Sequence, residues 1–314
     1  MYNGMQVSLL LAREIAELFL ILLMGVAVVR TGLLRAADSK VVSVLQVYLV
    51  VPCVILNAFQ IEDTPQVRTG LLYALVIATG IHLFWLVLTK LIGKPLGLDN
   101  IERATAIYSN AGALVIPLVQ ALQGQDYVIY SCAFIIVQLV LLWTHGVVLM
   151  RGQGGLQWKT ILTNVNLISI AVGVLLYLFK IPLPAPLLDT MDSMGAMMGP
   201  LCMLLAGMAI AESPVRRLVG TARYYLASAL RLLVYPLAVL AVLWLLKASS
   251  WIPDGKSVLM TVFLATITPA CATLTSMAQL YDCDVKKSSS LYVLSTLLSI
   301  LTMPVMLGLF DILL

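Results

Sequence analysis

The sequence predicts an all-α integral membrane protein of ten transmembrane helices, and three observations support this fold class. Charged residues make up 11% of the 314-residue chain, whereas a typical soluble domain has about 25%. Hydrophobic residues reach 61%, which is more apolar surface than a water-soluble fold of this length can hide. The apolar residues also gather in long runs, each close to the roughly 20 residues that a helix needs to cross a bilayer. These runs are too long and too uniformly apolar for the strands of a β-barrel.

Ten apolar segments follow one another along the chain and are separated by short polar loops. We number them one to ten and expect them at 7–29, 39–60, 69–92, 102–122, 127–150, 162–180, 189–211, 222–246, 257–280 and 288–310. Segment one is not expected to be a cleaved signal peptide, because no Lys or Arg precedes it and Arg13, Glu14 and Glu17 interrupt it.

The basic residues of the loops predict the orientation. Thirteen Lys and Arg lie in the loops after the odd-numbered segments, and four lie in the loops on the other side. Because cytoplasmic loops carry an excess of Lys and Arg, the odd-numbered loops are expected in the cytoplasm. Both termini are then expected on the non-cytoplasmic side of a cell membrane, either plasma or inner.

The chain divides into two similar halves. Five spans in each half would turn the second half upside down relative to the first. The midpoint falls in a flexible Gly-Gln-Gly-Gly loop, so we expect a first five-helix repeat at 1–151, a cytoplasmic linker at 152–161 and a second repeat at 162–314. Corresponding interruptions are predicted in segments two and seven, at Pro52 and Pro200, and in segments four and nine.

The interruptions in segments four and nine predict a binding site. A proline inside a helix removes a backbone donor, and in lipid the freed backbone groups need partners in protein or in a water-filled cavity. Half-helix N-termini there carry free N–H groups and a partial positive charge, which favour an anion. A single break usually indicates only a kink, but paired breaks are typical of the binding site of an inverted-repeat transporter. The residues concerned are Asn110, Gly112 and Pro117 in segment four, and Thr268, Pro269, Thr273 and Thr275 in segment nine.

Several motifs resemble the auxin efflux carrier family. Residues 108–118 are similar to the family's signature in its fourth helix, and residues 278–281 and 294–304 are similar to its last two helices. Weaker matches occur at 50–52 and 143–146. The resemblance covers essentially the whole chain.

This resemblance implies crossed, interrupted helices four and nine in a mobile transport domain of helices 3–5 and 8–10. It also implies a scaffold of helices 1, 2, 6 and 7 that forms a homodimer. Family members carry small organic anions, including auxin in plants and dicarboxylates in bacteria, and Asn57 matches a polar position that lines the family's site. Val115 replaces a glycine of the family, Leu274 replaces a proline of the plant members, and the long central loop of plant carriers is absent. A bacterial-type carrier is therefore expected.

Three ionisable residues within the spans are candidates for ion coupling or charge pairing, because an unpaired charge in lipid is costly. Glu17 lies one helical turn after Arg13, and an ion pair between them is favoured over ion coupling. His82 lies in the middle of segment three, where a proton carrier and a hydrogen-bonded packing residue both fit. Arg231 in segment eight would pair either with a substrate carboxylate or with protein groups.

A GxxxG pattern in segment seven, formed by Gly195 and Gly199, allows close approach of another helix. Both a dimer contact and packing within one chain would use it.

Signatures of other classes are missing from the sequence. Gly255, Lys256 and Ser257 resemble the end of a P-loop, but Ser250 stands where that motif needs glycine. The sequence contains no HExxH, GxSxG or CxxC motif, and its net charge of +4 is too dispersed for a nucleic-acid surface. We therefore expect no enzyme, no metal, no cofactor and no nucleic-acid partner.

The sequence thus predicts a secondary transporter that moves a small organic anion, a carboxylate, by elevator-like alternating access. Without a nucleotide site, proton or sodium gradients or the membrane potential would drive it. The alternatives are a membrane receptor or sensor that binds a similar ligand without translocation, and a channel.

Overall fold

The computed structural model describes residues 4–60, 65–152, 163, 165–211 and 221–314. These residues form helices and turns, with one isolated pair of bridged residues and no strand among them. The predicted linker at 152–161 lies outside this description except for Gly152.

The helices of the first half are α1 (Gly4–Arg30), η1 (Ala36–Asp38), α2 (Ser39–Leu45), η2 (Gln46–Val50), α3 (Val51–Ala58), α4 (Pro65–Gly93), α5 (Asn100–Ile107), α6 (Ala111–Leu122), η3 (Gln125–Tyr127), α7 (Val128–Leu141), η4 (Leu142–Gly146) and α8 (Val147–Arg151). Those of the second half are α10 (Val165–Leu178), α11 (Ala185–Ala196), α12 (Met198–Ile210), α14 (Ala222–Ala229), η5 (Leu230–Val234), α15 (Tyr235–Leu245), η6 (Ala248–Ser250), α16 (Gly255–Ile267), α17 (Thr273–Leu280) and α18 (Val285–Leu313).

Six helical stretches in the described part of the chain are long and apolar enough to cross a membrane, and they coincide with predicted segments two, three, five, seven, eight and ten. They are Ala36–Asn57, Val67–Gly93, Val128–Arg151, Ala185–Met208, Ala222–Leu245 and Val285–Leu313. Shorter apolar helices lie in segments one, six and nine, at Phe19–Arg30, Ile168–Leu178 and Gly255–Ile267. Segments four and nine are each divided into two half-helices, so neither half reaches the length of a span. The total of ten spans therefore stays a prediction.

The outer face of α4 carries an exposed apolar stripe. Leu72, Val76, Leu83 and Val87 are each more than half exposed and follow one another at helical spacing. The opposite face of the same helix is buried. An exposed apolar stripe of this length is expected where the solvent is lipid rather than water.

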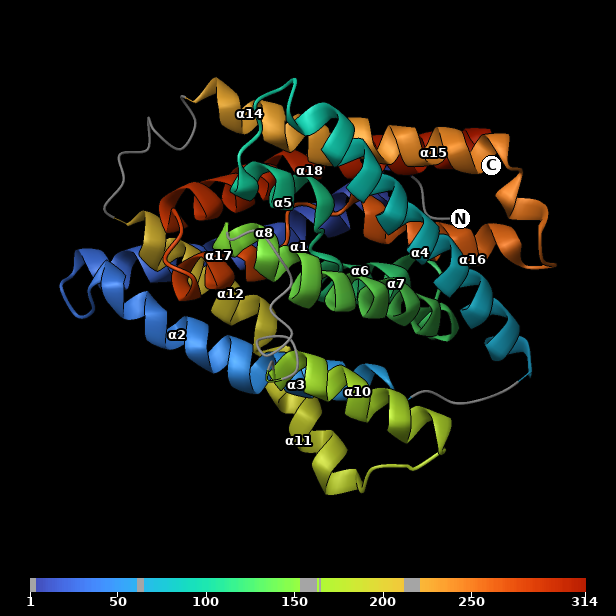
Figure 1. Ribbon diagram of the computed structural model, residues 1–314, viewed down its shortest axis with the longest axis horizontal. Coiled ribbons are helices and arrows are strands. Elements are labelled where there is room, and N and C mark those ends of the chain that lie inside the picture. The colour runs from blue at the N-terminus through green and yellow to red at the C-terminus, as the bar shows by residue number, and fades with distance from the viewer. Residues whose placement is uncertain (1–3, 61–64, 153–162, 164, 212–220) are drawn as a thin grey trace.

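Half-helices of the interrupted segments lie between two groups of longer helices. In Figure 1, α14 and α15 lie along one edge of the molecule, α2, α3, α10 and α11 lie along the opposite edge, and α5, α6 and α17 lie between them. Helix α3 packs against α10 and α11, α1 against α12, and α4 against α7. The half-helices are thus enclosed by long helices from both halves of the chain.

Prolines distort segments two and seven without the full interruption that we predicted. A π-helical turn, η2, runs directly into α3, so the chain stays helical through Pro52. Segment seven bends at Met197, between α11 and α12, and Pro200 lies in the first turn of α12. Proline is tolerated in a first turn because its missing N–H would have no helical partner there, and a π-helical turn absorbs a local loss of backbone bonding.

Helices α1 and α12 approach each other closely through two glycines. A Cβ on Gly25 would overlap the carbonyl oxygen of Leu204, and a Cβ on Gly207 would overlap that of Leu22. The predicted GxxxG pattern is less tightly packed at Gly195, where a Cβ would lie 3.3 Å from a side-chain carbon of Val54 in the same chain. Small residues therefore determine how near these helices come.

We expect Gly207→Ala and Gly25→Ala each to lower the free energy of unfolding by about 1–3 kcal/mol, because the added methyl group forces the two backbones apart. Thermal unfolding of detergent-solubilised protein, followed by tryptophan fluorescence, measures the change. The matched control is Gly80→Ala in α4, where a Cβ meets no atom within 4 Å. Equal melting temperatures for all three variants would contradict the close approach of α1 and α12.

Candidate functional site

The interruptions of segments four and nine meet in the interior. Helix α5 ends at Ile107 and the chain is extended at Tyr108, while α16 ends at Ile267 and the chain is extended at Thr268. The two extended stretches run antiparallel and bridge at Ser109 and Ala270. Two interrupted helices therefore cross and are joined at their breaks by backbone contacts.

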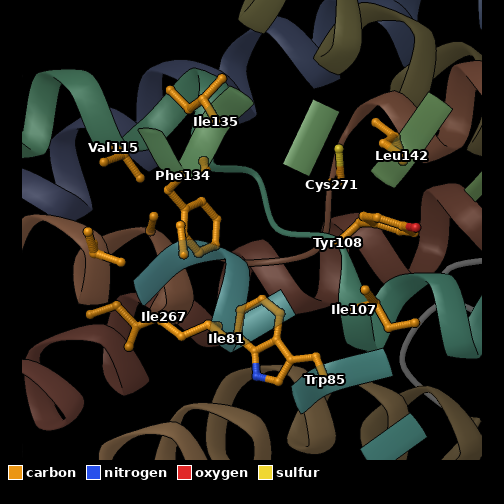
Figure 2. Packing of buried hydrophobic residues seen from close by; sticks show 14 of the residues in the cluster. Ile81, Trp85, Ile107, Tyr108, Val115, Phe134, Ile135, Leu142, Ile267 and Cys271 are labelled. Atoms are coloured by element: carbon orange, nitrogen blue, oxygen red, sulfur yellow. The ribbon is translucent and has the colours of Figure 1, made fainter. Parts of the chain in front are cut away.

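Two backbone hydrogen bonds hold the crossing. The N–H of Asn110 donates to the carbonyl of Pro269 at 2.8 Å, and the N–H of Cys271 donates to the carbonyl of Tyr108 at 2.9 Å. Figure 2 shows Tyr108 and Cys271 beside each other on the two extended stretches. Each break thus satisfies backbone groups of the other, as an unwound segment in a membrane must.

Side chains from neighbouring helices complete the bonding of the two extended stretches. Gln138 of α7 accepts from the N–H of Ser109 at 2.9 Å and donates to its carbonyl at 2.8 Å. Ser295 of α18 accepts from the N–H of Ala270 at 3.1 Å. Each stretch therefore has a polar side chain on its outer edge as well as the partner stretch on its inner edge.

Arg231 lies at the C-terminal ends of both half-helices α5 and α16. Its side chain is fully buried and donates to the carbonyls of Thr268 at 3.0 Å and Thr266 at 2.6 Å. It also donates to the carbonyls of Ala106 at 3.3 Å and Ile107 at 3.4 Å. A helix C-terminus carries a partial negative charge, so one guanidinium compensates two helix ends.

The ring of Trp85 covers one face of this guanidinium, and other aromatic residues pack behind that ring. The guanidinium carbon atom lies 4.8 Å from the ring centroid of Trp85, within the range of a cation–π contact. His82 is buried against Trp85 and Phe134, with ring centroids 5.5 Å and 4.5 Å away, and its Nδ1 lies 2.8 Å from the carbonyl of Ala78. Its Nε2 has no hydrogen-bond partner among the described residues. The candidate ionisable residues His82 and Arg231 thus share one side of the crossing.

Polar side-chain groups at the N-terminal ends of α6 and α17 have no hydrogen-bond partner in the described part of the chain. The amide nitrogen of the Asn110 side chain and the hydroxyl of Thr275 are buried and have no partner within the described part of the chain. Ser276 donates to Gln46 of η2 at 2.7 Å, and Gln46 lies 2.6 Å from the sulfur of Cys202 in α12. Because a helix N-terminus carries a partial positive charge, these ends and their unpartnered groups suit an anionic ligand.

The break in segment four begins at Tyr108, earlier than the sequence predicted, whereas the break in segment nine begins at Thr268 as predicted. Asn110, Thr268 and Pro269 lie at the crossing itself, but Thr273 begins α17 and Thr275 follows within it. Gly112 and Pro117 lie within α6, and their side-chain surroundings are outside the described structure. The reason is tertiary: the cross-bridge and the Gln138 and Ser295 side chains fix the extended stretches at positions that no proline marks in segment four.

Two other predicted residues lie elsewhere. Asn57 of α3 donates a hydrogen bond to Asp192 of α11, at the packing surface between these helices. The side chain of Glu17 is exposed on α1. Its expected pairing with Arg13 falls on a side chain outside the described structure.

The sequence did not identify Gln138, Gln46 or Trp85 as residues of the crossing. Ser295 entered only as part of the stretch 294–304 that resembles the family. Gln138 and Gln46 each had a usable signal, because an isolated polar residue inside an apolar span usually bonds another helix. Trp85 had none, since its role depends on Arg231 standing over its ring.

The fold and this crossing define a class of protein. A bundle of apolar helices with two interrupted helices meeting inside it is typical of secondary transporters. The chain belongs to the family described as membrane transport protein, the auxin efflux carrier family, whose profile matches residues 10–157 and 155–307. No curated protein sequence gives a significant match.

The family resemblance seen in the sequence is thereby confirmed. The chain is a multi-pass membrane transporter, and the prediction that it is not an enzyme is confirmed by its membership of a transporter family. The two matched stretches meet at 155–157, inside the linker predicted at 152–161.

We expect Arg231→Met to lower the free energy of unfolding by about 3 kcal/mol or more, because it leaves buried carbonyls at two helix ends without a donor and each hydrogen bond to a charged group contributes about 1.5–3 kcal/mol. Thermal unfolding in detergent measures the loss. The control is Arg35→Met, since the side chain of Arg35 is 85% exposed and its ion pair is expected to contribute little. Equal stability of the two variants would show that the carbonyls find other donors.

Proposed function

We propose that this transporter carries a small organic anion, a carboxylate, which binds where segments four and nine cross. The observation that carries this proposal is the electrostatic asymmetry of the crossing. The C-terminal ends of α5 and α16 already have their cation in Arg231. The N-terminal ends of α6 and α17 bring partial positive charge and unpartnered polar groups together.

The contacts around those N-terminal ends support an anion rather than a cation. Their described polar neighbours are Gln46, Ser276 and Cys202, and the hydroxyl of Tyr292 lies near the Asn110 side chain without forming a close hydrogen bond to its amide nitrogen. All four side chains are neutral, and those of Gln46, Ser276 and Cys202 bond one another. Within the described residues, the contacts of this cluster include no Asp or Glu that would repel an anion.

Alternating access is proposed to follow the division of helices that the resemblance implies. The ten segments would form two inverted repeats with odd-numbered loops in the cytoplasm and both termini outside. In support, Gln138 of segment five and Ser295 of segment ten perform matching tasks on the two extended stretches. Such a correspondence is expected when two halves of a chain have the same fold.

Packing supports an elevator-like movement of one group of helices against the other. Segments one and seven pack together as α1 and α12, segments two and six as α3 and α10, and segments three and five as α4 and α7. The first two pairs would form the scaffold, which would also form the homodimer, and the third would move with the crossing. The energy would come from a proton or sodium gradient or from the membrane potential, which contributes about 2.3 kcal/mol per charge per 100 mV.

We expect Asn110→Ala to abolish saturable flux while leaving the protein folded, because it removes a buried donor at the crossing. Uptake of radiolabelled mono- and dicarboxylates into proteoliposomes, at two pH values and with or without sodium, measures the loss. Asn100→Ala at the start of α5, outside the crossing, is the matched control and should retain flux.

The same assay separates the mechanisms. A carrier saturates, a channel conducts without saturation, and a receptor binds ligand without flux. Unchanged saturable flux in Asn110→Ala would place the substrate elsewhere.

A further inference from the structure

A cavity with a mostly apolar wall and several basic side chains lies away from the N-terminal ends of α6 and α17. Its volume is about 340 Å³, and it opens between α4, α5 and the helix formed by η4 and α8. Three basic side chains, Lys90, Arg103 and His145, line it together with apolar side chains that include Leu86 and Leu149. None of these residues belongs to the crossing.

Within the described structure, the side chain of Arg103 has a nitrogen atom without a hydrogen-bond partner. Its Nε is buried and has no hydrogen-bond partner among the described residues. It lies against the end of α4, where a Cβ on Gly93 would be 3.1 Å from the Nε atom. A buried guanidinium nitrogen without a partner is costly unless an acceptor fills the cavity.

The acidic residues of the same stretch are already engaged. Glu102 is fully buried and forms ion pairs with Arg223 at 2.9 Å and Lys287 at 2.8 Å, and Asp99 also pairs with Lys287. In the described structure no carboxylate forms an ion pair with Lys90 or Arg103. The positive charge of the cavity is therefore left for a molecule from outside the chain.

The cavity adjoins the lipid-facing surface. Lys90 lies on α4 next to Leu83, Val87 and Leu91, which are 55%, 57% and 66% exposed, and Val87 itself lines the cavity. A molecule that enters from this side meets hydrocarbon-compatible surface and basic groups together. An amphiphile with an anionic head matches both features.

His145 connects the cavity with the crossing. Its Nδ1 lies 2.8 Å from the hydroxyl of Tyr108, and the carbonyl of Tyr108 accepts the hydrogen bond from Cys271 that joins the two extended stretches. An occupant of the cavity is thus two contacts away from the backbone of the crossing.

We propose that this cavity binds the headgroup phosphate of an anionic phospholipid, with its acyl chains along the exposed stripe of α4. Lys90 and Arg103 bind the phosphate, and the apolar wall holds the start of the acyl chains. Basic pockets between membrane helices, at the end where the positively charged loops lie, suit anionic headgroups. Lys90 and Arg103 lie near the ends of α4 and α5 that flank the loop carrying Lys94. The proposal does not depend on the identity of the transported substrate.

Native mass spectrometry of the full chain in neutral detergent, titrated with phosphatidylglycerol or phosphatidylcholine, tests the proposal. Phosphatidylglycerol should bind at least about tenfold more tightly, because two basic residues at about 1 kcal/mol each favour its charge. Lys90→Gln and Arg103→Gln should each weaken its binding about fivefold. The matched control is Lys94→Gln, which removes a charge from the same loop region outside the cavity and should leave binding unchanged.

A second variant tests the apolar wall without touching a charge. Val87→Trp on the exposed face of α4 should weaken phosphatidylglycerol binding, because the larger side chain fills the mouth of the cavity. Equal affinity for the two lipids would overturn the proposal, as would equal weakening by Lys94→Gln and Lys90→Gln, which indicates general surface attraction. Competition by glycerol phosphate as strong as that by the whole lipid would also overturn it and assign the cavity to a soluble anion.

Discussion

The structure depends on one requirement: the backbone groups released where two membrane helices break must find partners away from water. The two breaks provide partners for each other, through the hydrogen bonds from Asn110 to Pro269 and from Cys271 to Tyr108. Gln138 completes the bonding of one extended stretch from α7. If the extended stretches moved apart, each would lose these partners at once, so the crossing behaves as one unit.

Arg231 makes the crossing electrostatically asymmetric. By compensating the C-terminal ends of α5 and α16, it leaves the positive ends of α6 and α17 as the uncompensated part of the crossing. Its charge lies over the ring of Trp85 and is buried away from water, so the carbonyls and the ring together must offset its desolvation. Separating Arg231 from either half-helix would leave the buried guanidinium and the carbonyls at that helix end without their partners, which is costly. Segments four, eight and nine would therefore stay together in any helix movement.

The helices around the crossing differ in what their surfaces contact. Gly25 and Gly207 allow α1 and α12 to pack backbone against backbone, as rigid supports do. Helix α4 has three different surroundings: Trp85 contacts Arg231 at the crossing, Leu83 lies on the exposed apolar face, and Lys90 lines the basic cavity. Substitutions on this helix should therefore have effects that depend strongly on the face they alter.

The sequence by itself determined the membrane environment and the helical class, because apolar runs of span length leave few other folds. It also identified the two segments that break, and Asn110, Thr268 and Pro269 as residues at the breaks. Only the tertiary structure decided where the break in segment four begins, since the bridging partner and Gln138 come from distant parts of the chain. It likewise decided the partners of Arg231, because the sequence does not show which acceptors folding brings to a charge in a span. Here they are the carbonyls of two half-helices more than 30 residues away.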